Sequence, residues 1–108
     1  MSENSTTIIN IKSKKPYDIY IGRPSIWGNP FSHTNDSKYQ TIKVNTAEDA
    51  IRFYETYLAT QIELGYITTQ DLLELDGKIL GCWCSPKPCH GQAIIRAIEI
   101  EKEFFNEQ

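Results

Sequence analysis

Short runs of apolar residues with different spacings divide this chain into a few elements. The β-branched and apolar residues at 7–12 and 17–21 are typical of two strands. The short turn between them, punctuated by Pro16, favours a hairpin. A continuous apolar run at 78–83 predicts a buried strand, and the composition of 39–44 suits one more short strand.

Two stretches between these strands repeat apolar residues at helical spacing and begin with capping signals. The first starts after Thr46, whose hydroxyl can accept from the free amides of a first turn, and ends at Gly65. The second spans 67–75, with Thr68 or Thr69 as its cap. Both segments are therefore predicted to be helices.

A last helix is predicted from His90 onward, because apolar residues follow it at helical spacing. The expected order is then β-β-loop-α-α-β-α. This order predicts a single small α/β domain over 7–108, with helices packed on a few-stranded sheet and a flexible arm at 1–6. The segment 22–44 is rich in Gly, Pro, Ser and Asn and is expected to be mostly irregular.

Composition and charge narrow the classes of function. With 108 residues, 40% hydrophobic and 23% charged, the chain has the profile of an ordinary globular domain. A net charge of −3 opposes sequence-independent binding to duplex nucleic acid. No apolar run approaches the roughly 20 residues that span a bilayer, and the polar start carries no export signal. A cytoplasmic protein with no membrane partner is expected, and an odd cysteine count argues against a disulfide framework.

The densest chemical signal is a cluster of four soft ligands, Cys82, Cys84, Cys89 and His90, within nine residues. These residue types can hold zinc as a structural or interaction module. The spacings of one and zero intervening residues strain a tetrahedral site, so stoichiometric zinc is not expected. In the blander alternative, the first two cysteines pack in the core as small apolar side chains.

The same segment also fits an anion pocket. Free amides at 89–91, at the start of the last helix, attract phosphate or carboxylate, and Gly91 lets a ligand approach the backbone. The field at this helix start favours the thiolate of Cys89, and His90 beside it could assist. Cys89 and His90 are therefore the candidate catalytic pair, with Cys84 and Gly91 as ligand contacts.

A second motif follows the strand at 17–21. Arg23 offers several N–H donors for a phosphate or carboxylate, and Trp27 offers a flat face for a base or a sugar. The side-chain amide of Asn29 can hydrogen-bond to an amide or a hydroxyl of a ligand. In the packing alternative, Trp27 and Phe31 cover the core and Arg23 pairs with an acid, and for these two aromatic residues packing is favoured. The candidate ligand contacts of this motif are Gly22, Arg23, Ser25, Trp27, Gly28 and Asn29.

Together, YIGRPSIWGNPF at 20–31 and GKILGCWCSPKPCHG at 77–91 resemble the family catalogued as domain of unknown function 4326, found in bacterial and phage proteins. The resemblance covers most of the chain. It implies a small α/β domain with the signature residues in one pocket, and it supplies no reaction. The family's second motif usually ends in CHGD, where this chain has Gln92. If that acid is catalytic, this chain binds without turnover.

The two motifs both follow strand ends, so we expect them to lie side by side in one pocket. Its residue types suit a nucleotide, a nucleoside phosphate or a ribose-containing metabolite. The expected function is binding of such a small molecule, with a possible reaction at its glycosidic or phosphoryl part. Two alternatives stay open: a zinc-bearing structural module, and a non-catalytic phage-type binder that sequesters a nucleotide signal.

Overall fold

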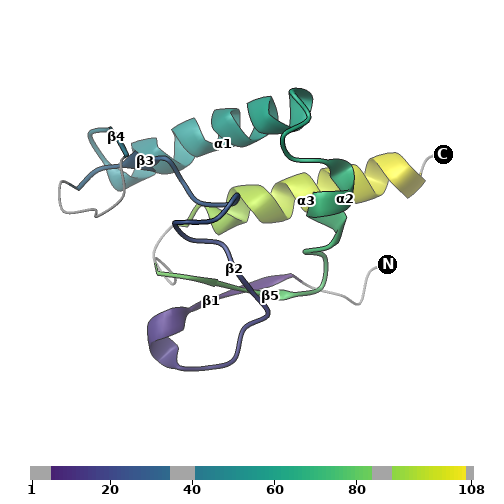
Figure 1. Ribbon diagram of the computed structural model, residues 1–108, viewed down its shortest axis with the longest axis horizontal. Helices are drawn as coiled ribbons and strands as arrows, with labels where there is room; N and C mark the ends of the chain where they lie inside the picture. Colours follow the sequence, from purple (N-terminus) through teal and green to yellow (C-terminus); the bar gives the residue numbers. More distant parts are fainter. Residues whose placement is uncertain (1–5, 35–40, 84–88, 107–108) are drawn as a thin grey trace.

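The computed structural model describes residues 6–34, 41–83 and 89–106. Their elements form a three-stranded sheet with helices on one side and a separate two-stranded pair (Figure 1). The expected α/β class is confirmed, whereas most of the arm at 1–6 lies outside the described residues. In chain order the strands and α-helices are β1 (Thr7–Asn10), β2 (Ile19–Tyr20), β3 (Phe31–Ser32), β4 (Ile42–Lys43), α1 (Ala47–Glu63), α2 (Thr69–Leu73), β5 (Ile79–Cys82) and α3 (Gly91–Asn106).

The first two strands do not form the expected hairpin, and that prediction is wrong. β5 lies between β1 and β2 and pairs in parallel with both, so that Ile8 and Ile19 both lie opposite Leu80. After β1 the chain makes a 3-10 turn that ends at Lys14 in the left-handed region, with φ of 64°. The remaining connection to β2 crosses to the far side of β5, so the carboxyl ends of all three strands meet at one edge.

The helices begin and end where local signals place them. The Thr46 hydroxyl accepts from the amide of Asp49, 3.0 Å away, and caps α1. Thr68 and Asp71 form a reciprocal capping box at the start of α2. α1 is followed by Gly65, with φ of 86°, a backbone conformation that glycine adopts without strain.

The hydrophobic core lies between the helices and one face of the three-stranded sheet. Figure 1 shows α1 and α3 on the same side of this sheet. Among the described residues, no helix combines the length and the apolar character needed to span a bilayer. The largest fully buried side chains are Tyr54, Ile21, Leu72, Leu75, Leu80, Ile94, Ile98 and Cys82.

The segment at 22–44 is less irregular than its composition suggests. Phe31 pairs with Ile42 and Ser32 with Lys43, which makes the parallel pair β3–β4 beside α1. Of the strand expected at 39–44, residues 42–43 are confirmed as β4 and 39–40 lie outside the described residues. β3 has no counterpart among the expected elements, because two residues leave no readable period.

Candidate functional site

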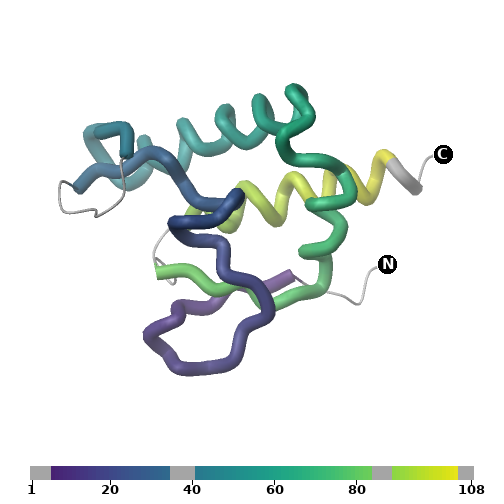
Figure 2. The backbone as a smooth tube through the Cα atoms, in the orientation of Figure 1, coloured from purple at the N-terminus to yellow at the C-terminus, as the bar shows by residue number. Residues whose placement is uncertain are grey.

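The loop after β2 and the start of α3 lie side by side, as the two-motif hypothesis expects. Figure 2 shows the segment that follows β2 passing the beginning of α3. The direct link is His90, whose Nε2 lies 2.8 Å from the carbonyl oxygen of Ile21. A carbonyl only accepts, so Nε2 carries the hydrogen and Nδ1 is the acceptor nitrogen of the neutral ring.

His90 is buried and neutral, with an exposed fraction of 5%. Burial is the main cause that lowers its pKa below the ordinary value of 6.5, and the charge of Arg23 acts in the same direction. Hydrogen bonds to the backbone of Ile21 and Trp27 act against this shift. The ring also packs edge-on against Tyr54, with centroids 4.9 Å apart. His90 therefore joins the loop after β2 to α1 and α3.

The lowered pKa of His90 gives the fold a pH dependence. An unfolded histidine titrates near 6.5 and the folded one below that, so between the two values the unfolded chain binds more protons. The free energy of unfolding should then fall by about 1.4 kcal/mol for each pH unit in that window, and stay level above it. Urea unfolding followed by circular dichroism from pH 7.5 to pH 5 measures the slope.

The matched control for this pH dependence is His90→Gln, whose side-chain amide can still donate to Ile21. The variant should lack the His90 contribution to the slope. Equal slopes in the wild type and in His90→Gln would contradict a neutral, buried His90.

The two described cysteines of the cluster are in contact in the interior. Cys82 and Cys89 are 0% and 3% exposed, and the Cys89 thiol donates to the Cys82 sulfur across 3.3 Å. The Cys89 sulfur also accepts from the amide of Gly91 at 3.4 Å and lies 3.8 Å from Nδ1 of His90. The burial of Cys82 matches the alternative in which this cysteine packs in the core as a small apolar side chain.

The zinc alternative needs four ligands, of which three lie in the described part of the chain. Within the described part of the chain, no group of three His, Cys, Asp or Glu side chains is arranged to hold a metal ion. Cys84 lies outside the described residues. The catalytic roles of Cys89 and His90 also stay predictions, since the burial of both side chains leaves little surface for a substrate to touch.

The guanidinium of Arg23 is the polar group of this loop that points most clearly to a ligand. Its Nη1 is buried and has no hydrogen-bond partner among the described residues. The side chain folds over Gly28, where a Cβ would lie only 3.0 Å from Cγ of Arg23. A buried donor without a partner costs about 1–3 kcal/mol, and more when charged. The packing alternative, in which Arg23 pairs with an acid, is not seen among the described side chains.

The other loop residues form internal contacts. Trp27 is 5% exposed and belongs to the core, as its packing interpretation expects. The amide of Asn29 donates to the carbonyl of Ala50 at 3.1 Å and accepts from Phe31 at 2.9 Å, so it ties the loop to α1. The Ser25 hydroxyl donates to the carbonyl of Gly22 at 2.6 Å and shapes the turn. Their ligand-binding roles stay predictions.

The sequence reasoning missed three residues at the carboxyl edge of the sheet. The indole nitrogen of Trp83 donates to the hydroxyl of Tyr20 at 3.1 Å, and that hydroxyl donates to the carbonyl of Arg23 at 2.6 Å. Asn10, at the end of β1, donates to the carbonyl of Trp83 at 3.3 Å. For Trp83 this position could have been predicted, because side chains alternate along a strand and Trp83 therefore points to the face opposite Cys82.

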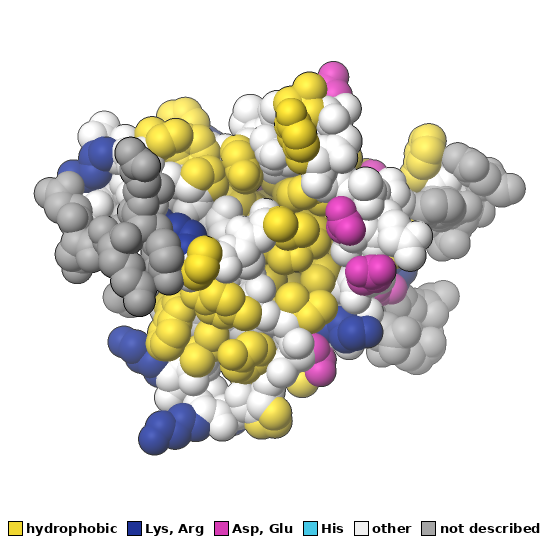
Figure 3. All heavy atoms as spheres, in the orientation of Figure 1, with side chains coloured by type: hydrophobic (Ala, Val, Ile, Leu, Met, Phe, Trp, Pro, Cys, Tyr) yellow, Lys and Arg dark blue, Asp and Glu magenta, His cyan; other side chains and the backbone are white. Residues whose placement is uncertain are grey.

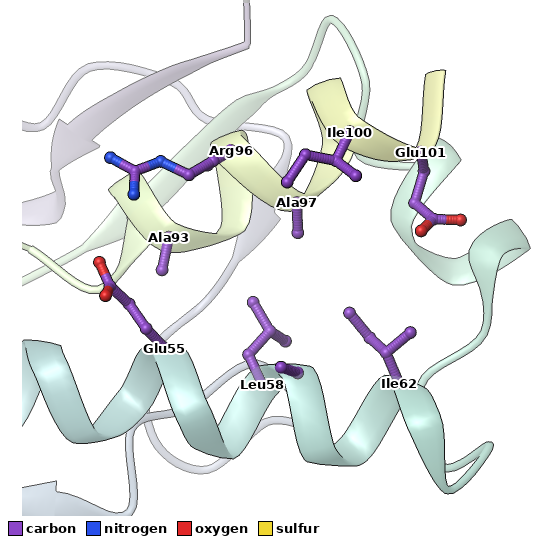
Figure 4. A pocket seen from close by; sticks show the side chains of 9 residues that line it. Glu55, Leu58, Ile62, Ala93, Arg96, Ala97, Ile100 and Glu101 are labelled. Atoms are coloured by element: carbon purple, nitrogen blue, oxygen red, sulfur yellow. The ribbon is translucent and has the colours of Figure 1, made fainter. Parts of the chain in front are cut away.

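A groove of about 310 Å³ between α1 and α3 is a separate feature (Figure 4). Leu58 and Ile62 from α1 face Ala93, Ala97 and Ile100 from α3, and two glutamates and an arginine lie at its edges. None of the sequence-predicted ligand contacts lines this groove. It is not part of the site formed by the two motifs.

Comparison with known proteins gives a family and no activity. The model of the family described as domain of unknown function (DUF4326) matches residues 9–100. A phage T4 protein described as an uncharacterized 12.4 kDa protein in the nrdA-td intergenic region is 34% identical over 87 residues, which cover 81% of this chain and 72% of the relative. No solved structure matches. The two motifs meet in the structure where His90 contacts the carbonyl of Ile21, and the chain belongs to the DUF4326 family.

Proposed function

We propose that this chain binds a small nucleotide-type ligand, a nucleotide, nucleoside phosphate or ribose-containing metabolite, with its anionic group at Arg23. The observation that carries this proposal is the buried Nη1 of Arg23, which has no partner among the described residues. A phosphate oxygen is the acceptor that a guanidinium matches best, because two N–H groups can donate to it in parallel.

The surroundings of Arg23 support an anion there. His90 supports this site by position, because its bond to the carbonyl of Ile21 holds the loop after β2 against the start of α3. The dipole of α3 adds a partial positive charge at its start. The amides of Gly91 and Gln92 there are not free, contrary to expectation, because they already donate to the sulfur and the carbonyl of Cys89.

Cys89 and His90 act as positioning residues in this proposal. His90 joins the loop to α3 through Ile21, and the Cys89 sulfur accepts from Gly91 at the start of the helix. Binding without a chemical step is therefore the form of the proposal that the buried thiol and imidazole support best. The outward-facing Gln92, where the family motif usually has an acid, points in the same direction.

The test is a calorimetric comparison of AMP with adenosine, which differ by the phosphate. AMP should bind at least about 10-fold more tightly, because hydrogen bonds to a charged group contribute about 1.5–3 kcal/mol. Chromatography of the AMP sample after incubation should recover unchanged AMP if the chain only binds. Equal affinity for AMP and adenosine, or no binding of AMP, would overturn the anion site at Arg23.

A further inference from the structure

Trp83 lies in an unusual setting for a tryptophan that directly follows a buried strand. Its side chain is 52% exposed, whereas its neighbour Cys82 is 0% exposed in the core. The residue sits at the carboxyl edge of the parallel strands β1, β5 and β2. In open sheets of parallel strands, ligands bind outside this edge.

The indole is exposed and also held in place. Its Nε1 donates to the hydroxyl of Tyr20 at 3.1 Å, and Asn10 donates to the Trp83 carbonyl at 3.3 Å. Gly22 allows this arrangement, because a Cβ there would lie 2.5 Å from the Tyr20 hydroxyl oxygen. With its polar nitrogen already bonded, the part of the indole that faces solvent is mostly an apolar ring surface.

The same hydroxyl joins the indole to the proposed anion site. Tyr20 donates to the carbonyl of Arg23 at 2.6 Å, so one tyrosine oxygen connects Trp83 to the backbone of Arg23. The outer sheet face beside it is also aromatic, since the ring of Tyr17 occupies the space where a Gly81 side chain would be. Figure 3 shows hydrophobic side chains gathered in the lower left of this view, where the sheet lies, with Lys and Arg side chains next to them.

We propose that the exposed indole of Trp83 is the surface on which a planar base of the ligand stacks. This inference rests on the proposed function and deepens it, because it requires a ligand that carries a nucleobase. A sugar phosphate without a base could contact Arg23 but could not stack on Trp83. Stacking of bases on aromatic side chains is general and tolerates any base. Trp27, the other tryptophan, is 5% exposed and has no comparable free surface.

The experiment compares AMP with ribose 5-phosphate, which lacks only the base. The wild type should bind AMP about 10-fold or more tightly than ribose 5-phosphate, and AMP should quench tryptophan emission. In Trp83→Ala the affinity for AMP should fall to that of ribose 5-phosphate, and the affinity for ribose 5-phosphate should stay unchanged. Trp83→Phe, which keeps a smaller ring, should retain part of the preference.

The matched control is Tyr66→Ala, which removes an aromatic ring that is 72% exposed away from the motifs. It should bind both probes like the wild type, and circular dichroism should show that all variants are folded. If AMP and ribose 5-phosphate bind equally to the wild type, or if Trp83→Ala weakens both alike, the stacking inference is wrong and the anion site stands. If neither probe binds, the proposed function fails together with the inference.

Discussion

Replacing Tyr54 with alanine is expected to lower the free energy of unfolding by about 3–5 kcal/mol, the range for removing a buried aromatic side chain. Tyr54 is 0% exposed, and its hydroxyl donates to the carbonyl of Trp27 at 2.8 Å. Its ring also supports the edge of His90. Burial raises the pKa of Tyr54, so the hydroxyl remains a donor across the usual pH range. Urea unfolding at pH 7.5 measures the loss.

Two further variants separate the ring of Tyr54 from its hydroxyl and from general effects of tyrosine. Tyr54→Phe should cost only about 1–2 kcal/mol, because it removes one hydrogen bond and keeps the packing. Tyr66→Ala, at a side chain that is 72% exposed, should stay within about 0.5 kcal/mol of the wild type. A Tyr54→Ala protein as stable as Tyr66→Ala would show that α1 does not hold the loop and His90 as described.

Arg23→Ala is expected to weaken AMP binding by about 1.5–3 kcal/mol, or roughly 10- to 150-fold. The reason is the loss of a guanidinium whose buried Nη1 has no partner within the described protein. The melting temperature should not fall, because the substitution also removes an unsatisfied buried donor from the folded state. Calorimetry with AMP and a thermal melt of the same sample measure both effects.

Arg52→Ala is the matched control for Arg23→Ala. Arg52 lies on α1, pairs with Asp49 three residues earlier, and has a side chain that is 75% exposed. Its loss should leave AMP binding unchanged and cost little stability, since exposed ion pairs contribute about 0–1 kcal/mol. A melting temperature that collapses in Arg23→Ala while the affinity for AMP is kept would assign Arg23 a structural role.

The parts of the fold that depend on local chemistry could be predicted from sequence. The start of α1 at Thr46, the capping box at Thr68 and the helix that ends before Gly65 all depend on residues a few positions apart. The hairpin was wrong because strand pairing depends on distant residues: β5 enters between β1 and β2 from about 60 residues further along the chain.

The candidate site, too, could be predicted only in part from the sequence. The loop motif and the start of α3 do meet, as two motifs at strand ends suggested. The burial of Trp27 agrees with the packing that its motif favoured, and alternation along β5 places Trp83 on the face opposite Cys82. The exposure of that opposite face could not be predicted, because it depends on what the rest of the chain packs against it. Trp27 turns into the core under Tyr54, whereas Trp83 lies on the outer side of the sheet edge.

The proposed ligand site lies where the loop after β2 meets the start of α3, and AMP serves as the probe for it. Titration of AMP into ¹⁵N-labelled protein, followed by two-dimensional amide NMR, locates the binding site residue by residue. The largest shift changes should fall on the amides of 22–28 apart from Pro24, and on those of Trp83 and 89–92. Changes confined to the groove between α1 and α3, around Leu58 and Ala97, or no changes at millimolar AMP, would contradict the proposed site.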